Sequence, residues 1–292
     1  MKNQNIVIVS IAVLAGMLLA VWGMFALGAN MPRGVTEFSQ TAYDLHMLIL
    51  WICVVIGVLV FGAMFVSIIL HRKSRGAEAA QFTHSTKAEI VWTSIPILIL
   101  VMMAVPATRA LLVMETSTGA EMDIKITGYQ WKWKYEYMDT GVSFISSLAK
   151  DSDIARQLDS GINPSTVDNY LLEVDNALVV PTDTKIRLLL TSGDVIHSWW
   201  VPELGWKRDA IPGTVNTAWT SINKPGTYRG QCAELCGKDH GFMPVVVIAK
   251  PKAEFEQWLA QQPGYTGGDD VSTLAEANPD ADPAGVEVAL AD

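Results

Sequence analysis

The sequence predicts a membrane α-helical hairpin followed by an all-β domain. Long apolar runs in the first 115 residues predict the hairpin. Beyond residue 121, apolar and polar residues alternate with a period of two, and short strand candidates follow between Gly and Pro residues. The composition averages over both parts, with 292 residues, 50% of them hydrophobic, and a formal net charge of −9.

Three apolar runs are each long enough, or nearly so, to cross ~30 Å of hydrocarbon as a helix. Basic residues gather between the second and third runs, in His71-Arg72-Lys73-Ser74-Arg75. Positive charge beside membrane helices marks the cytoplasmic side. We therefore expect a transmembrane hairpin over residues 29–116, with the rest of the chain outside the cytoplasm. The apolar runs are residues 6–27, 45–70 and 90–107, and the expected hairpin helices are about 45–70 and 90–114.

The first apolar run has two interpretations. Lys2, the apolar stretch and the small residues Ala26, Gly28 and Ala29 are typical of a signal peptide over residues 1–28. The run is also long enough to remain as an extra N-terminal helix. We favour cleavage near residue 28, and both interpretations place residue 30 outside.

The β domain is predicted over residues 117–262. Its clearest strand alternates aromatic and charged residues from Trp131 to Tyr137, which is typical of a half-buried antiparallel strand. Many short strands at this spacing indicate a sandwich or a barrel. The further candidates are residues 170–174, 184–191, 195–201, 217–222, 227–231 and 244–249, followed by an amphipathic helix at 252–262.

Two polar segments have no assigned role. Residues 143–169 interrupt the strand series, and we expect a surface insertion that holds a short helix. Residues 263–292 carry seven Asp or Glu and no Lys or Arg. Because such a composition cannot bury a core, we expect an acidic disordered tail.

The segment Cys-Ala-Glu-Leu-Cys-Gly-Lys-Asp-His-Gly-Phe-Met, from Cys232 to Met243, predicts a copper site. Two thiols, from Cys232 and Cys236, lie beside the imidazole of His240 and a thioether. Thiolate and thioether are soft ligands that suit copper. With His197 upstream, the set has one thiolate more than a mononuclear blue-copper site uses. Two bridging thiolates would let one site hold two copper ions that share one electron.

Two other interpretations of the cysteines stay open. Cys232 and Cys236 in an exported domain can form a disulfide, because three intervening residues permit a bridge. A zinc site would use Cys and His, but zinc knuckles usually combine two Cys-rich pairs and this chain has one. The sequence has no Cys-x-x-Cys-His motif for covalent attachment of a c-type haem, so an electron donor would be a separate molecule.

These residues resemble those of subunit II of the haem-copper cytochrome c oxidases, in the bacterial form that carries copper A. The resemblance covers roughly residues 35–260. Besides the copper segment it rests on four motifs, which are Glu89-Ile-Val-Trp-Thr-Ser-Ile-Pro96, Gly128-Tyr-Gln-Trp-Lys-Trp-Lys-Tyr-Glu-Tyr137, Val201-Pro-Glu-Leu-Gly205 and Asp209-Ala-Ile-Pro-Gly213.

The resemblance implies a cupredoxin-like Greek-key sandwich that holds a dinuclear copper A centre. Glu234 would contribute its backbone carbonyl to copper and its side chain to a magnesium or manganese site shared with subunit I. Cys232 and Cys236 would supply the two bridging thiolates. His197 and His240 would each cap one copper ion with an imidazole. Met243 would be a weak axial ligand through its thioether.

Four further residues receive roles by resemblance. Trp131 would be the entry point for electrons, and Glu89 would open a proton channel of subunit I. Glu136 and Asp194 would be acidic docking residues for a basic donor. The chain departs from the commoner family pattern at Lys132, where an aromatic residue usually follows the tryptophan, and a basic residue there can alter the donor preference.

The implied function is electron entry into an aerobic respiratory oxidase, an oxidoreductase and translocase acting on cytochrome c and oxygen. The chain would take electrons from cytochrome c and pass them to haem in subunit I, where oxygen becomes water and protons are pumped. The expected partners are subunit I, a subunit III, cytochrome c and membrane lipid, and no nucleic acid. The expected location is the bacterial inner membrane, with the copper domain on the periplasmic side.

Two alternative functions remain at this point. A membrane-tethered copper carrier or chaperone would need an exposed, exchangeable site, and would have no use for Glu89 or the Trp131 strand. A quinol oxidase subunit II has the same fold without copper, and the retained copper ligands argue against it.

Overall fold

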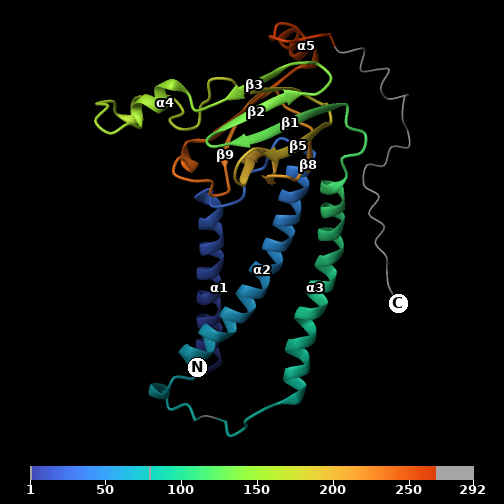
Figure 1. Cartoon of the computed structure of the whole chain (residues 1–292). Helices are drawn as coiled ribbons and strands as arrows, with labels where there is room; N and C mark the ends of the chain where they lie inside the picture. The colour runs from blue at the N-terminus through green and yellow to red at the C-terminus, as the bar shows by residue number, and fades with distance from the viewer. Residues whose placement is uncertain (1, 79, 268–292) are drawn as a thin grey trace. The chain divides into compact units, whose positions relative to one another are not determined.

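The structure, a computed structural model, describes residues 2–78 and 80–267 (Figure 1). The chain divides into two compact units. Among the described residues, the first unit holds the N-terminal helices up to Thr116 together with Glu203–Gly205, and the second holds residues 117–202 and 206–267. Long helices make up most of the first unit, and strands most of the second.

The helical unit consists of α1 (Lys2–Ala26), α2 (Glu37–Leu70) and α3 (Thr86–Glu115). All three are long and apolar enough to cross a membrane. Helix α1 packs against α2, where the rings of Phe25 and Trp51 stack with their centroids 5.8 Å apart. Cleavage of residues 1–28 stays a prediction, which N-terminal sequencing of the purified chain would test.

Polar caps make α2 and α3 longer than the apolar runs predicted. At the start of α2, the Ser39 N–H donates to Thr36 Oγ1 and the Thr36 N–H donates to Ser39 Oγ, which is a capping box. At the start of α3, the Ser85 side-chain oxygen accepts a single bond from the Ala88 N–H. Caps satisfy the backbone donors of a first turn without needing apolar residues, so both helices begin before their apolar runs.

The second unit is a β-sandwich of two five-stranded sheets, with strand orders β3-β2-β1-β5-β8 and β4-β10-β9-β6-β7. The pairs β1–β5 and β4–β10 are parallel and all other neighbours are antiparallel. The strands are β1 (Met122–Tyr129), β2 (Lys132–Tyr137), β3 (Ser143–Ser146), β4 (Leu178–Pro181), β5 (Ile186–Ser192), β6 (His197–Val201), β7 (Trp206–Ala210), β8 (Asn216–Thr220), β9 (Gly226–Cys232) and β10 (Pro244–Lys250).

The inward faces of the two sheets form the core. Trp133 and Tyr135 of β2 are fully buried, and Trp199 of β6 donates its Nε1–H to the Tyr135 hydroxyl at 3.3 Å. The Tyr137 hydroxyl donates to the Val179 carbonyl of β4 at 2.7 Å. The period-two burial predicted along β2 is therefore confirmed. The predicted combination of membrane helices and a cupredoxin-like sandwich is also confirmed.

Several strands differ from the prediction. Residues 170–174 are not a strand, and only Val174 forms an isolated bridge, to Leu148. The backbone at Leu171 is left-handed, with φ of 62°, which interrupts extended structure. Strands β3, β4 and β7 were not predicted, because β4 is buried at every position and β7 carries three charged residues, so neither shows a simple alternation.

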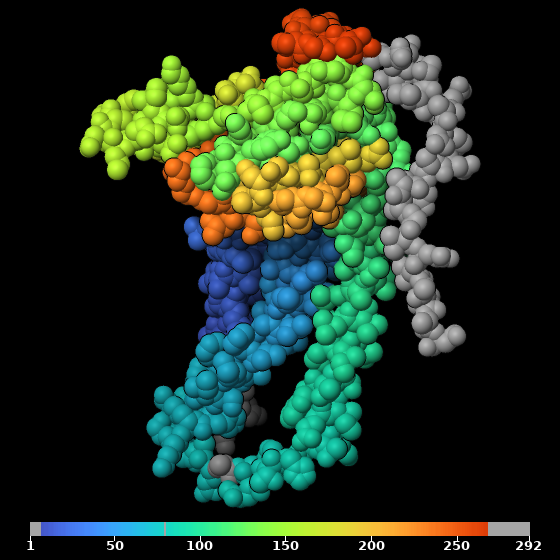
Figure 2. Space-filling model, in the orientation of Figure 1, coloured from blue at the N-terminus to red at the C-terminus, as the bar shows by residue number. Residues whose placement is uncertain are grey.

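The predicted insertion, residues 143–169, begins with β3, which pairs with β2, so its first residues belong to the sheet and not to an excursion. We call the segment between β3 and β4 the insertion; it projects from the sandwich and holds α4 (Lys150–Ala155) (Figures 1 and 2). Its two ends are tied together at the base. The Ala149 N–H donates to the Glu173 carbonyl at 3.0 Å, and the Leu171 N–H donates to Ser152 Oγ at 3.1 Å. The insertion is thus a closed, hydrogen-bonded excursion between β3 and β4.

Helix α5 (Lys252–Ala260) packs beside β2. It places the Trp258 ring 5.7 Å from the Tyr137 ring. Past α5, the Thr266 N–H donates to the Thr140 carbonyl at 3.0 Å, so residues 263–267 are attached to the sandwich and are not part of a disordered tail. The rest of the predicted tail, residues 268–292, lies outside the described residues.

Candidate metal centre

Strand β6 and the connection between β9 and β10 position the predicted copper ligands. His197 begins β6, Cys232 ends β9 and Met243 directly precedes β10. We call residues 232–243 the ligand loop. The Cys232 N–H donates to the Met243 carbonyl, and the Ala233 N–H donates to the Ser198 carbonyl, both at 2.9 Å. These two bonds fix the inner ends of the loop to each other and to β6.

The sulfur and imidazole ligands come together in one cluster. The ligand atoms of His197, Cys232 and Cys236 all lie within 4.8 Å of one another. The two sulfurs are 3.8 Å apart and are separate thiols, so the structure does not show the disulfide alternative. His197 Nδ1 lies 4.0 Å from the Cys232 sulfur, and His240 Nδ1 lies 3.6 Å from the Cys236 sulfur. Met243 is buried.

Asp194 orients the His197 imidazole. Its carboxylate accepts from His197 Nε2 at 2.8 Å and from the Gln130 N–H at 2.7 Å. When Nε2 carries the proton, Nδ1 keeps its lone pair facing Cys232, as a metal ligand requires. Burial lowers the pKa of His197, but the hydrogen bonds with Cys232 and Asp194 outweigh it, so the pKa is raised. The sequence predicted Asp194 only as a docking residue, and the Asp-x-x-His spacing is the local signal that could have indicated this second role.

Two residues close the remaining space around His197. A Cβ atom on Gly128 of β1 would lie 2.8 Å from His197 Cδ2, closer than side chains approach. The Trp133 ring meets the imidazole edge-on, with the centroids 5.9 Å apart. His197 itself has no exposed side-chain surface. The imidazole is therefore confined to one position, and residue 128 has to be glycine for it to fit.

The two thiols differ in proton affinity. Burial raises the pKa of Cys232, but hydrogen bonds with His197 and the backbone outweigh burial and lower it to about 6. Burial and the charge of Cys232 raise the pKa of Cys236 to about 12. A cation beside the two sulfurs would favour the deprotonation of both thiols, as metal binding requires. Two thiolates, two imidazoles and a buried thioether are a donor set that fits copper.

The backbone carbonyl and the side-chain carboxylate of Glu234 lie in different surroundings. Its backbone carbonyl lies 3.4 Å from the Cys232 sulfur, so it faces the cluster. Its side chain is exposed. This is the arrangement needed for a carbonyl that serves the cluster and a carboxylate that serves a separate ion or partner.

Trp131 touches the ligand loop directly. Its Nε1–H donates to the Cys236 carbonyl at 3.3 Å, and the Gln130 side-chain amide donates to the same oxygen at 2.8 Å. Trp131 is half-buried, and the Lys238 ammonium lies 5.6 Å from the centre of its ring. The aromatic ring therefore connects the domain surface to a residue that carries one of the thiols.

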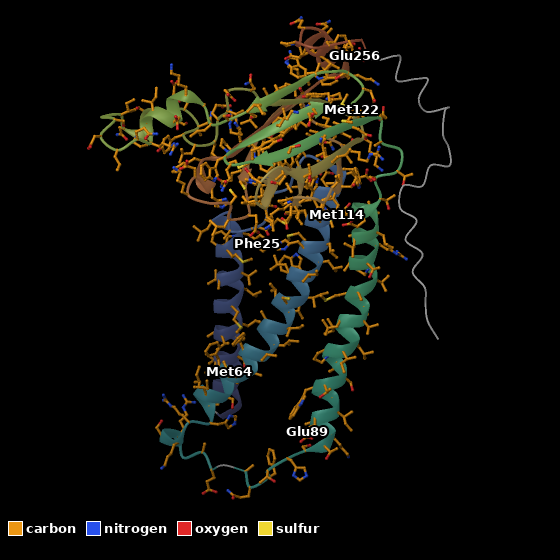
Figure 3. All side chains as sticks on the ribbon, in the orientation of Figure 1. Phe25, Met64, Glu89, Met114, Met122 and Glu256 are labelled. Carbon is orange, nitrogen blue, oxygen red and sulfur yellow. The ribbon has the colours of Figure 1, made fainter. Side chains whose placement is uncertain are left out.

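The remaining predicted residues lie elsewhere. Glu136 of β2 is paired with Lys134 at 2.8 Å and with Lys125 at 3.5 Å. Glu89 is exposed in the first turn of α3, where the helix dipole favours a carboxylate (Figure 3). The docking roles of Glu136 and Asp194 and the proton-channel role of Glu89 stay predictions.

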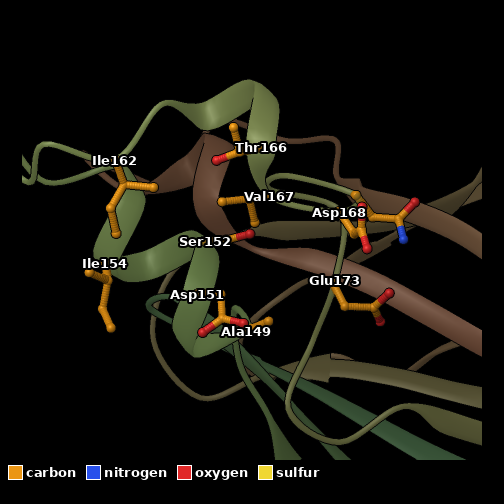
Figure 4. Close-up of a pocket in the computed structure, with 10 residues that line it drawn as sticks. Ala149, Asp151, Ser152, Ile154, Ile162, Thr166, Val167, Asp168 and Glu173 are labelled. Carbon is orange, nitrogen blue, oxygen red and sulfur yellow. The ribbon is translucent and has the colours of Figure 1, made fainter.

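One hollow lies in the insertion, and none of the clustered ligands lines it. It has a volume of about 500 Å³ and lies between α4 and residues 162–173 (Figure 4). Its polar lining includes Asp151, Asp168 and Glu173, and none of the predicted site residues lines it. The hollow is therefore not part of the metal cluster.

Comparison with known proteins assigns the family. The family described as "Cytochrome C oxidase subunit II, periplasmic domain" matches residues 122–250, and "Cytochrome C oxidase subunit II, transmembrane domain" matches residues 20–109. A Rickettsia bellii protein named "Probable cytochrome c oxidase subunit 2" is 38% identical over 82% of this chain and 86% of its own. The chain belongs to the cytochrome c oxidase subunit II family. It is therefore a membrane-bound subunit of an oxidoreductase complex, with an oxidase periplasmic domain, and subunit I is its partner.

A second relative named in the same way supports this assignment. A Rickettsia prowazekii protein of the same name is 42% identical, over 77% of this chain and 69% of its own. Among solved structures, the periplasmic domain of cytochrome oxidase subunit II from Bradyrhizobium japonicum is 40% identical. That match covers 50% of this chain and 96% of the solved one, with a TM-score of 0.44.

Proposed function

We propose that the chain is the electron-entry subunit of a cytochrome c:oxygen oxidoreductase that pumps protons, and that it holds two copper ions in the ligand loop. The observation that carries the proposal is the cluster in which His197, Cys232 and Cys236 place their ligand atoms within 4.8 Å of one another. His240 and Met243 complete the donor set. When bound, the copper pair supplies a site that stores a single electron shared between two metals.

The protein's contribution is to hold the donor atoms still. Cys232 and Cys236 would be shared by both ions, while His197 and His240 would each bind one. Asp194 fixes the tautomer of His197, and packing against Gly128 prevents its rotation. An electron carrier benefits from such rigidity, because little has to move when the charge changes.

Trp131 is the proposed point of contact with the donor, cytochrome c. Its hydrogen bond to the Cys236 carbonyl supports this role, since it links the half-buried ring to a ligand residue. Glu136 and Asp194 are proposed to attract a basic donor, and Lys132 beside Trp131 is proposed to modify that preference. Haem in subunit I would receive the electron and carry out the oxygen chemistry.

Two carboxylates are proposed to act at the boundary with other subunits. The exposed side chain of Glu234 would bind a magnesium or manganese ion shared with subunit I. Glu89, at the cytoplasmic start of α3, would open a proton channel of subunit I. A subunit III completes the proposed complex, which would lie in the bacterial inner membrane with residues 117–262 on the periplasmic side and residues 29–116 as the hairpin.

The test is copper counting and electron paramagnetic resonance on the full-length chain, purified in detergent and loaded with copper. Two coppers per chain and a seven-line hyperfine pattern are expected for an electron shared by two ions. One copper with a four-line pattern would instead support a copper carrier or chaperone. Absence of bound copper would support the quinol oxidase alternative.

A further inference from the structure

The insertion reaches the ligand loop through one side chain. Arg156, which follows α4, places its guanidinium carbon 4.4 Å from the centre of the Phe242 ring. Its Nη1 lies 3.5 Å from Asp239 Oδ1. Asp239 and Phe242 stand on either side of His240 and Gly241 in the chain. Arg156 therefore holds both sides of the turn that carries the second imidazole.

Arg156 is itself held in place. Its Nε–H donates to Asp153 Oδ1 at 2.8 Å, and its side chain is only 22% exposed. Helix α4 is fixed at its base by the bond from the Leu171 N–H to Ser152 Oγ. The far end of the insertion is tied to β9 by the ion pair between Glu173 and Arg229 at 2.6 Å. The Arg156 guanidinium is thus held in a fixed position beside the ligand loop.

On the side of Cys236 and Lys238, the loop is held by Gln130 and Trp131, but the His240 turn beyond them has mainly local backbone bonds. The inner ends of the loop are fixed to each other and to β6 by backbone bonds, whereas the turn's own backbone bonds are local. They run from the His240 N–H to the Gly237 carbonyl at 3.2 Å and from the Phe242 N–H to the Asp239 carbonyl at 2.9 Å. Local bonds of this kind shape a turn but do not fix it to the rest of the domain.

We propose that Arg156 is a positioning residue for His240, and that the insertion presents it to the ligand loop. The planar guanidinium stacks on the Phe242 ring while its edge faces the Asp239 carboxylate, a combination that suits arginine better than lysine. The proposal rests on the proposed copper function, because His240 is a ligand only if copper binds. It gives the insertion, which no other observation explains, a defined role.

The experiment uses the full-length chain in detergent and the substitution Arg156→Gln. In the metal-free chain, amide hydrogen exchange over residues 237–243 is expected to become about tenfold faster. This factor corresponds to the combined free energy of one partly buried cation–π contact and one ion pair. In the copper-loaded chain, release of copper to a chelator is expected to accelerate by a similar factor. The lines of the electron paramagnetic resonance spectrum should broaden, because His240 would take up a wider range of orientations.

Matched variants separate positioning from general stability. Arg156→Lys keeps the charge but loses the planar stack, and should recover part of the effect. Arg187→Gln removes a comparable ion pair, to Asp123 between β5 and β1, and should leave the loop unchanged. If Arg156→Gln fails to fold, Asp239→Asn and Phe242→Leu weaken the same contacts from the loop side and should each reproduce part of the effect.

The outcomes distinguish this inference from the function on which it rests. The positioning role would be overturned if Arg156→Gln kept the wild-type rates of amide exchange and copper release and the wild-type line shape. The same results in both loop-side variants, Asp239→Asn and Phe242→Leu, would also overturn it. A wild-type chain that binds no copper would overturn the proposed function. In that case, faster exchange in metal-free Arg156→Gln would still establish that the insertion braces the loop.

Discussion

Gly128 is a residue at which one added methyl group should disable the metal cluster. In Gly128→Ala the new Cβ would lie 2.8 Å from His197 Cδ2, and the imidazole has no free space into which it can move. We expect copper affinity to fall at least about tenfold. This is the lower end of the loss in metal affinity that follows when a residue supporting a ligand is changed. Chelator competition on the purified chain measures the affinity.

The control for this substitution is Gly241→Ala inside the ligand loop. A Cβ at Gly241 would meet nothing within 4 Å, so copper affinity should stay at the wild-type value. Equal losses in the two variants would show that a methyl group added anywhere near the cluster has this effect, and would remove the specific role of Gly128.

The ligands could be predicted from the sequence, but the residues that hold them could not. Cys232, Cys236, His240 and Met243 lie in one short segment, where their chemical types are recognisable together. Gly128 meets His197 only after β1 pairs with β5, a pairing that joins residues far apart in the chain. Asp194 is only three positions before His197, but an acidic residue at that spacing does not by itself indicate that it orients a ligand. Short-range spacing carries little information about such contacts.

At the scale of elements, β2 carries a charge cluster that should make stability depend on pH. Burial raises the pKa of Glu136, but the hydrogen bond from Lys134 and the charges of Lys134 and Lys125 outweigh it, so the pKa is lowered. A lowered pKa in the folded state stabilises the protein at pH above the unfolded value of about 4.3, and this stabilisation is lost as the pH falls through the folded value.

Glu136→Gln should therefore lower the free energy of unfolding by up to about 1 kcal/mol at pH 7, the usual size for a partly exposed pair. The difference from wild type should shrink toward zero as the pH is lowered below about 4. Thermal unfolding in detergent at several pH values measures it. Glu256→Gln, an exposed acid on α5, is the control, and a pH-independent difference for Glu136→Gln would contradict the linkage.

The elements differ in how well the sequence predicts them. The membrane helices follow from their apolar runs, and β2 follows from its alternation, because burial repeats there with a regular period. Strands β4 and β7 lack that period, since β4 is buried throughout and β7 carries Lys207, Arg208 and Asp209. Their extended structure depends on pairing with β10 and β6, which only the folded sandwich supplies.

For the whole molecule, the proposed docking of a basic cytochrome c should be sensitive to salt. The chain has a formal net charge of −9, and long-range attraction to a basic partner weakens as ionic strength rises. Turnover of the intact oxidase should fall about tenfold between low and physiological salt, within the range of electrostatic steering. An uncharged reductant serves as the control. A flat salt dependence with cytochrome c would exclude steering by Glu136 and Asp194.

The proposed proton-channel role of Glu89 is also a property of the whole complex. Glu89→Gln should slow oxygen consumption by the purified oxidase while leaving the copper resonance spectrum of the chain unchanged, because α3 contributes no copper ligand. Glu78→Gln, which changes an exposed acid before α3, is the matched control. Wild-type turnover in Glu89→Gln would exclude the role.

The spacing of the ligands along the chain has a consequence for the order of assembly. His197 and Cys232 are 35 positions apart, with β7 and β8 between them, and the ligand loop is closed by β10, which pairs with β9 and β4. Contacts between distant residues form slowly during folding. The complete set of donors consequently exists only once the last strands have joined their sheet. Copper would then enter a scaffold that is already built, unlike the metal of a zinc finger, which drives the folding of its own site.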